Sequence, residues 1–282
     1  MTLRQYISAS ISRLSPVYDQ SEGRWLMRII LEHLKGWSQS DILLKDDDEI
    51  DPSLSERIDT IINRLLTHEP IQYILGETYW HGLKIKVTPA VLIPREETSE
   101  LIDIIADENK GSDMNVLDVC TGSGCIAIAL ARTLPFAQVT AVDISADALD
   151  VARQNGEMCK TKITFIQSDA LKALPLPDNS FDIIVSNPPY IAQNEERLMS
   201  PNVLDYEPHV ALFVPDDDPL RFYKAISSDA TRLLKPGGKL YYEINPLYSA
   251  RLADMLEHDG WQDISVIKDI HGKDRFISAR HS

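Results

Sequence analysis

The feature that most constrains this fold is the alternation of helix-like and strand-like segments from about residue 96 onward. Short apolar runs alternate with segments of helical periodicity, which is typical of a mainly parallel sheet with helices on both faces. We expect strands at Asn115–Val119, Gln138–Asp143, Ile163–Gln167, Phe181–Ser186, Lys239–Ile244, Ile264–Lys268 and Arg275–Ala279. We expect helices at Ser99–Asp107, Cys125–Thr133, Ala146–Asn155, Pro219–Leu234 and Leu247–His258.

The last two expected strands are separated only by Asp269–Asp274, which is too short for a crossover helix. They must therefore pair antiparallel. The predicted fold class is α/β, with a Rossmann-like, seven-stranded, mainly parallel sheet that has an antiparallel C-terminal strand. A small helical domain precedes it.

The first seventy residues have helical periodicity. One apolar stripe consists of Ile58, Ile61, Ile62, Leu65 and Leu66, and a second helix, from about Tyr18, is expected to face inward with Trp25, Leu26, Ile29, Ile30 and Leu34. The next segment alternates apolar and polar residues like a β-hairpin, with Gly76 and Gly82 as turn residues. The predicted domains are therefore a helical domain at 1–70, a hairpin linker at 71–95 and an α/β domain at 96–282.

Composition narrows the function classes. The chain has 28 Lys and Arg against 43 Asp and Glu, a formal charge of −15, which disfavours binding to a phosphate backbone. Its longest apolar run, Cys125–Ala131, is too short to span a membrane, and the N-terminus lacks a secretory apolar region. The three cysteines include no CxxC pair. We therefore expect a cytoplasmic protein without a metal site.

A glycine-containing turn follows the first expected strand of the sheet. Cys120-Thr121-Gly122-Ser123-Gly124 lies between that strand and an apolar helix, an arrangement that lets a ligand approach the backbone closely. Asp143 ends the next strand, 21 residues after Gly122, where a carboxylate can accept both hydrogen bonds of a ribose diol. This order predicts nucleoside binding. Gly122-x-Gly124-x-x-Ala127 also fits a dinucleotide fingerprint, so NAD remains an alternative.

Asp169 follows the third expected strand. Its carboxylate is a candidate partner for an adenine amino group, and it is equally a candidate solvated loop residue.

The fourth expected strand runs directly into Asn187-Pro188-Pro189-Tyr190. The Asn187 side chain and the Pro188 backbone each supply a carbonyl acceptor, and Tyr190 supplies a flat ring. Together they form a receptor for a planar –NH2 group. Orienting such a nitrogen toward an electrophilic methyl group could lower the barrier by up to about 7–11 kcal/mol.

Several segments together resemble the peptide-chain release factor glutamine N5-methyltransferases. They are Thr121–Gly124, Phe181–Ile191, Gln72–Gly76, Val91–Arg95, Asp143–Leu149, Glu207–Pro208 and Gly272–Arg275. The resemblance implies S-adenosylmethionine as cofactor and, as substrate, the glutamine of the Gly-Gly-Gln tripeptide in class I release factors. It also implies an enzyme of translation termination that binds a protein. From the charge and the short apolar runs we expect neither nucleic acid nor membrane as a direct partner, and we expect a monomer.

By the same resemblance, the cofactor would contact Cys120, Thr121, Gly122, Ser123, Gly124, Asp143 and Asn187, with Asp169 as a further candidate. The glutamine amide would be held by Asn187, Pro188, Pro189 and Tyr190, of which Asn187, Pro188 and Tyr190 are the predicted catalytic residues. The N-terminal helices would dock the release factor.

Three positions depart from the family's usual pattern. Cys120 stands where glycine is usual, Ala170 stands where some relatives have an aromatic residue, and Asn245 stands where glycine is usual after the fifth strand. We expect none of the three to contact the amide receptor.

Three other functions remain as alternatives. A nucleic-acid adenine N6-methyltransferase would present the same –NH2 group to Asn187–Tyr190, but it would have to flip the base and bind phosphates. An NAD-dependent oxidoreductase would leave the Asn-Pro-Pro-Tyr segment unexplained. A non-catalytic binding protein with the same fold would not need that segment.

Overall fold

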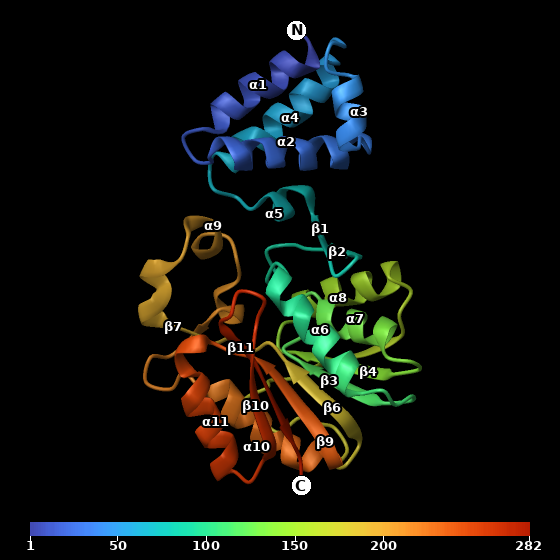
Figure 1. The fold of residues 1–282 in the computed structure, drawn as a ribbon, viewed down its shortest axis with the longest axis vertical. Coiled ribbons are helices and arrows are strands. Elements are labelled where there is room, and N and C mark those ends of the chain that lie inside the picture. The colour runs from blue at the N-terminus through green and yellow to red at the C-terminus, as the bar shows by residue number, and fades with distance from the viewer. The chain divides into compact units, whose positions relative to one another are not determined.

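The computed structural model describes residues 1–282 and divides the chain into two compact units, each of which is visible in Figure 1. The first unit comprises Met1–Gly76 and Ser200–Tyr206, and the second comprises Glu77–Met199 and Glu207–Ser282. None of the helices combines the length and the hydropathy that a membrane-spanning segment needs.

The first unit is helical. Its helices are α1 (Leu3–Leu14), α2 (Gln20–Lys35), α3 (Gln39–Leu44), α4 (Pro52–Leu65), α5 (Ile71–Leu75) and α9 (Pro201–Leu204). Asp51 caps α4 by accepting the Ser53 N–H, as its position before Pro52 suggests. Ser200–Tyr206 belongs to this unit although it is distant in sequence, and the Tyr206 hydroxyl donates to the Thr67 carbonyl at 2.7 Å.

Helix α2 buries a different stripe from the predicted one. Leu26 and Ile30 are buried as expected, but Trp25 is 42% exposed, so the expectation that it faces inward was wrong. Met27 and Leu31 occupy the core instead. Successive residues of a helix differ by about 100°, and a stripe that contains Leu26, Met27, Ile30 and Leu31 leaves Trp25 outside.

The predicted hairpin consists of β1 (Glu77–Trp80) and β2 (Leu83–Lys86), paired antiparallel. Its turn is His81-Gly82, and both residues have positive φ, as a two-residue turn of this kind requires. Gly76 is also a turn residue, as expected, but it lies before the hairpin. Helix α5 precedes the hairpin, and Gly76 ends it with a φ of 76°.

The second unit contains the predicted seven-stranded sheet. Its strands are β3 (Asn115–Val119), β4 (Gln138–Asp143), β5 (Ile163–Gln167), β6 (Phe181–Ser186), β9 (Leu234–Glu243), β10 (Gln262–Lys268) and β11 (Asp274–Arg280). The strand order is β10-β11-β9-β6-β3-β4-β5. Both pairings of β11 are antiparallel and the other pairings are parallel, which confirms the predicted fold class.

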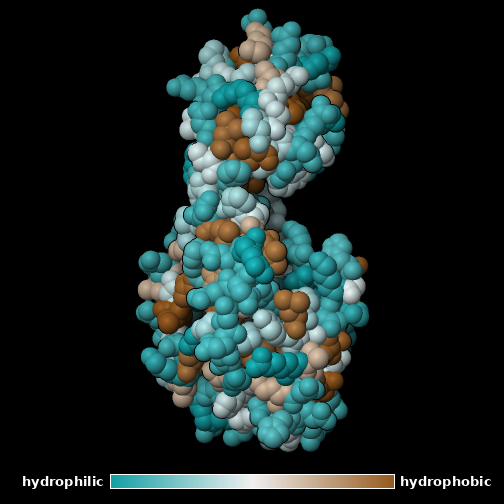
Figure 2. Space-filling model, turned by 90° about the vertical axis from the view of Figure 1, so that its left-hand side faces the viewer, coloured by the Kyte–Doolittle hydropathy of each residue, from teal (hydrophilic) through white to brown (hydrophobic).

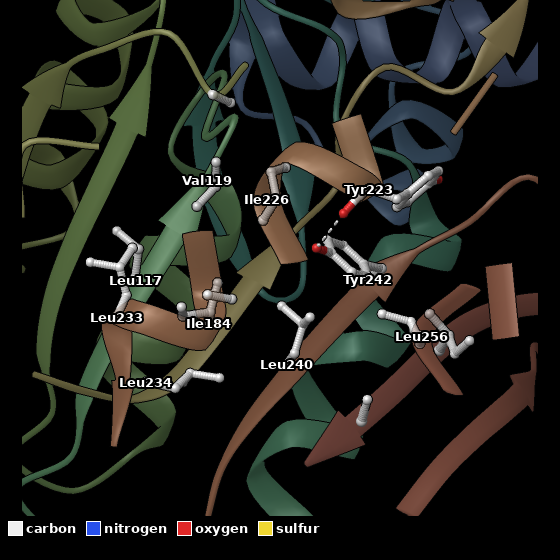
Figure 3. Packing of buried hydrophobic residues seen from close by; sticks show 14 of the residues in the cluster. Leu117, Val119, Ile184, Tyr223, Ile226, Leu233, Leu234, Leu240, Tyr242 and Leu256 are labelled. Carbon is white, nitrogen blue, oxygen red and sulfur yellow. Dashed lines mark hydrogen bonds between the residues drawn. The ribbon is translucent and has the colours of Figure 1, made fainter. Parts of the chain in front are cut away.

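Helices cover both faces of this sheet (Figure 1). One face carries α6 (Glu96–Glu108), α7 (Cys125–Thr133) and α8 (Ala146–Met158), and the opposite face carries α10 (Arg221–Leu233) and α11 (Ser249–His258). The core under α10 and α11 is drawn in Figure 3, where strand residues such as Leu117, Ile184 and Leu240 meet helix residues such as Ile226 and Leu256. This packing fixes the carboxyl ends of β3, β6 and β9.

A tyrosine pair reinforces that core next to the end of β9. The rings of Tyr223 and Tyr242 meet edge to face with their centroids 5.1 Å apart (Figure 3). The Tyr223 hydroxyl donates to the Glu243 carbonyl at 3.0 Å. A buried hydroxyl that is satisfied in this way costs little and fixes the backbone at the last residue of β9.

The connection from β6 to α10 contains short elements that the sequence analysis did not predict. They are β7 (Ile191–Ala192), η1 (Gln193–Leu198), α9, η2 (His209–Ala211) and β8 (Phe213–Val214). β7 and β8 pair in parallel. The first of these elements, β7, begins immediately after the predicted site segment Asn187–Tyr190.

Hydrophilic residues predominate on the face shown in Figure 2, where apolar residues form scattered patches. The most exposed large apolar side chains, among them Leu44, Phe136 and Ile270, come from different elements. Single exposed apolar residues of this kind are normal in folded proteins.

Candidate active site

A cavity lies at the carboxyl ends of β3, β4, β5 and β6, where parallel sheets of this kind bind ligands. Of the predicted site residues, its lining contains Cys120, Thr121, Gly122, Ser123, Asp143, Asp169, Asn187 and Pro189. Gly124, Pro188 and Tyr190 lie outside that lining. The cavity thus brings most of the glycine turn together with Asp143, Asp169 and two residues of the Asn-Pro-Pro-Tyr segment.

The two glycines of the turn have different roles. Gly122 has a φ of 54°, and a Cβ there would meet no atom within 4 Å, so its backbone conformation is what favours glycine. Gly124 has a φ of 79°, and a Cβ there would lie 3.0 Å from the Cβ of Ala152. Gly124 therefore also allows α7 to pack closely against α8.

Asp143 is held by backbone donors and faces the cavity. Its Oδ2 accepts the Gly122 N–H at 2.8 Å and its Oδ1 accepts the Ser145 N–H at 2.9 Å. Burial raises the pKa of Asp143, while these backbone N–H groups favour the ionised form. Each carboxylate oxygen keeps acceptor capacity beyond its backbone bond, which is what recognition of a diol requires.

Asp118 is the last residue but one of β3, and it was not singled out from the sequence. Its fully buried Oδ2 accepts the Thr121 hydroxyl at 2.6 Å and the Ala127 N–H at 3.2 Å, and its Oδ1 has no partner. Burial raises the pKa of Asp118 to about 7. The side chain ties the glycine turn to the first turn of α7. The sequence feature that could have indicated Asp118 is an acidic residue within a mostly apolar strand.

Cys120 has an unusual backbone conformation, with a φ of 63°. A residue with a Cβ pays about 1–2 kcal/mol for this left-handed conformation, which explains why glycine suits the position. Burial raises the pKa of the Cys120 thiol, so it stays protonated and packs as a small apolar group. Ala170, the second departure, is buried and lines the cavity with a single methyl group.

Asp169 lies at the cavity with part of its side chain in solvent. Its Oδ1 accepts the Leu171 N–H at 3.0 Å, and its Oδ2 lies 3.3 Å from the Lys172 Nζ. The backbone N–H of Leu171, followed by Lys172, lowers the pKa of Asp169, so the carboxylate is ionised at neutral pH. These contacts are compatible with both interpretations made from the sequence.

The Asn-Pro-Pro-Tyr segment is joined to a buried acid at the end of β9. Asn187 Nδ2 donates to Glu243 Oε2 at 3.0 Å, and the Tyr190 hydroxyl donates to Glu243 Oε1 at 3.0 Å. Thr98 of α6 donates to Oε2 at 2.5 Å. Glu243 and Thr98 were not predicted, because nothing local in the sequence indicates that β9 and α6 meet the end of β6.

Asn245 overturns one expectation. Its Nδ2 donates to the Tyr190 carbonyl at 3.2 Å and to Glu195 Oε1 at 3.0 Å. The prediction that no departure from the family pattern contacts the amide receptor was therefore wrong. The amide side chain of Asn245 reaches the Tyr190 backbone, which a glycine could not do.

An ion pair fixes one rim of the cavity. Arg95 lines the cavity and donates to Glu207 Oε1 at 2.6 Å, and Glu207 Oε2 accepts the Ile93 N–H at 3.2 Å. Glu207 is buried. The ion pair joins two of the sequence segments on which the resemblance depended, Val91–Arg95 and Glu207–Pro208. The indole N–H of Trp80 also donates to the Arg95 carbonyl, at 2.7 Å.

Comparison with known families agrees with this two-part organisation. Residues 110–259 match the family model described as "Methyltransferase domain", and residues 5–76 match the one described as "PrmC N-terminal domain". Among solved structures, a methyltransferase from Pyrococcus furiosus superimposes with a TM-score of 0.52 at 17% identity, covering 82% of this chain and 98% of that one. At this identity, the likeness shows the fold alone.

Curated relatives cover nearly the full length. A release factor glutamine methyltransferase from Bacteroides thetaiotaomicron is 46% identical over 266 residues, which are 94% of this chain and 95% of the relative. Another from Flavobacterium psychrophilum is 41% identical over 98% of both chains, and one from Streptococcus pneumoniae is 38% identical over 92% of both. This chain therefore belongs to the release factor glutamine methyltransferase family.

Proposed function

We propose that this protein transfers a methyl group from S-adenosylmethionine to the side-chain amide nitrogen, N5, of a glutamine in peptide-chain release factors. The target is the glutamine of the Gly-Gly-Gln tripeptide. The observation that carries the proposal is the pairing of Asn187 with Glu243 at the cavity, because it leaves the Asn187 carbonyl oxygen to accept a hydrogen bond from an –NH2 group.

The cofactor fits the residues of the cavity. Asp143 offers acceptor capacity on both carboxylate oxygens, as a ribose diol requires, and Gly122 beside it leaves open space where a Cβ would stand. We infer that Asp169, which lines the cavity, accepts a hydrogen bond from the adenine amino group. When bound, S-adenosylmethionine supplies a methyl group on a sulfonium, which needs no activation by the protein.

The protein's task is then to orient a poor nucleophile. An amide nitrogen shares its lone pair with the carbonyl, so gripping both of its N–H bonds directs the lone pair out of the amide plane. The Asn187 side chain and the Pro188 carbonyl are the two acceptors, and Tyr190 supports the amide plane. No general base is needed, because the methylated amide nitrogen is strongly acidic and loses its proton readily.

The other parts of the proposal concern the partner. The helical unit at the N-terminus docks the release factor, the enzyme acts as a monomer in the cytoplasm where release factors work, and no nucleic acid or membrane is needed. The formal charge of −15 supports a protein substrate over a nucleic acid.

Incubation with labelled S-adenosylmethionine tests the proposal. A purified class I release factor, transfer RNA and duplex DNA are offered separately, and a release factor with its tripeptide glutamine changed to alanine serves as the control. We expect label in the unaltered release factor only. Label in nucleic acid with none in release factor would instead establish the adenine N6-methyltransferase alternative.

A further inference from the structure

A buried carboxyl group, that of Glu243, lies next to the cavity and is bonded to Asn187, which lines it. The proposed function gives this carboxyl group no role. Glu243 is the last residue of β9, and its neighbour Tyr242 is in register with Ser186 of β6. This pairing places Glu243 beside Asn187, the first residue after β6. Glu243 is 1% exposed.

The hydrogen bonds of Glu243 all come from neutral side chains. Asn187 and Tyr190 each donate at 3.0 Å, and Thr98 donates at 2.5 Å. Thr98 and Asn187 donate to Oε2 and Tyr190 donates to Oε1, so Glu243 is the acceptor in all three hydrogen bonds. A buried acid costs free energy unless it is satisfied in this way, so the three donors and the acid hold one another in place.

The bond to Asn187 fixes the orientation of an otherwise ambiguous side chain. A carboxamide has a donor end and an acceptor end of nearly the same shape, and it can turn over at little steric cost. Toward Glu243, only the NH2 end makes a favourable contact. The carbonyl end of Asn187 is therefore the one that remains for a ligand in the cavity.

We propose that Glu243 is a positioning residue for amide methylation: it holds Asn187 with its oxygen toward the substrate –NH2 and fixes the Tyr190 hydroxyl beside it. This inference rests on the proposed function. Glu243 does not accept the substrate's proton, because it is 1% exposed and is not among the residues that line the cavity. Its effect therefore falls on the rate of methyl transfer and not on the affinity for either substrate.

The first variant is Glu243→Gln, which keeps the shape of the side chain but replaces one acceptor atom by a donor. We expect kcat to fall roughly 10- to 100-fold, with KM for the release factor and Kd for S-adenosylmethionine within about threefold of wild type. Glu108→Gln is the matched control. Glu108 also bonds a tyrosine of β9, Tyr241, but it contacts no residue of the receptor. We expect this control to keep the wild-type kcat.

A swap of donor and acceptor separates positioning from a merely structural role. Asn187→Asp alone sets two carboxylates against each other, which is unfavourable. In the double variant Asn187→Asp, Glu243→Gln, the amide at position 243 donates to the carboxylate at position 187, whose other oxygen can accept from the substrate. We expect the double variant to have a kcat at least about tenfold higher than Asn187→Asp alone at alkaline pH.

Wild-type kcat in Glu243→Gln would overturn the inference, and so would a double variant no faster than Asn187→Asp. If Glu243→Gln fails to fold, the comparison of Asn187→Asp with the double variant decides alone. Wild-type protein is assayed in parallel on the release factor. If it transfers no methyl group, the proposed function fails, whereas a normal wild type with an unaffected Glu243→Gln refutes only the role of Glu243.

Discussion

The two halves of the cavity hold their polar groups in different ways. In the half formed by β3, β4 and β5, Asp143 accepts backbone N–H groups from the glycine turn and from its own loop, and Asp169 accepts one from its own loop. In the half formed by β6 and β9, Asn187 and Tyr190 are fixed by the buried side chain of Glu243. Any sequence that folds into the same loops supplies these backbone donors. In the second half, by contrast, the positions of the polar groups depend on side chains from segments that are distant in the sequence.

This difference suggests a division of labour. A cofactor that is common to many reactions can be bound by a turn and an acid, and an amide that must be oriented needs side chains with fixed donor and acceptor ends. Substitutions in the first half should therefore change affinity, and those in the second half should change turnover.

The largest effect is expected for Asn187→Ala, which removes the side-chain acceptor for the substrate –NH2. We expect kcat to fall by about 100-fold or more, because the nucleophile is no longer oriented, while Kd for S-adenosylmethionine changes much less. Single-turnover methylation of a release factor and calorimetry with the cofactor measure the two quantities. Unchanged turnover would show that the Asn187 side chain does not orient the substrate amide.

Asp143→Ala is expected to have the opposite profile. Hydrogen bonds to a charged group contribute about 1.5–3 kcal/mol, so Kd for S-adenosylmethionine should rise by roughly 10- to 100-fold. At saturating cofactor, kcat should stay near the wild-type value. If Asp143→Ala and Asn187→Ala weakened cofactor binding equally, the two halves would not differ in the way described.

The glycine turn gives a smaller effect, on stability. Gly122→Ala should destabilise the protein by about 1–2 kcal/mol, from its φ alone. Gly124→Ala should cost about 1–3 kcal/mol more, because its methyl group would also press on Ala152. Urea unfolding of the two variants compares them directly. Equal losses of stability would mean that α7 and α8 do not need the close approach at Gly124.

The last effect concerns Asp118 and depends on pH. Its folded pKa, about 7, lies above its ordinary value of 3.8, so between these values the native state keeps a proton that the unfolded chain has lost. The contribution of Asp118 to stability therefore falls as pH rises through this window. Within this window, the free energy of unfolding of Asp118→Asn should increase relative to that of wild type by at most about 1.4 kcal/mol per pH unit. Above the folded pKa of Asp118, the difference between the two proteins should stay constant. Urea unfolding of wild type and Asp118→Asn across this pH range tests the prediction. If the free energies of unfolding of the two proteins changed in parallel with pH, the prediction would be contradicted.

The sequence predicted the sheet well because its signals are local. The strand positions follow from short apolar runs, and the antiparallel end follows from the brevity of Asp269–Asp274. The glycine turn and Asp143 were also local, since they lie within one strand–helix–strand unit. The same local logic failed at Trp25, which helical spacing grouped with Leu26 and Ile30 but which is exposed in the structure.

The second half of the cavity could not be predicted in the same way. Thr98, Asn187 and Glu243 are far apart in the chain, and their contacts appear only when α6, β6 and β9 are packed together. Asn245 was noted as a departure, but its bond to the Tyr190 carbonyl depends on the same packing. Local patterns indicate which residue types are present there, but not which of them hydrogen-bond to one another.

The central claim is that the amide nitrogen of one glutamine receives the methyl group. The most direct test is tandem mass spectrometry of a class I release factor after incubation with this protein and S-adenosylmethionine. The account predicts one added methyl group, located on the side chain of the Gly-Gly-Gln glutamine. An unmodified tripeptide, or a methyl group found only at another residue, would contradict it.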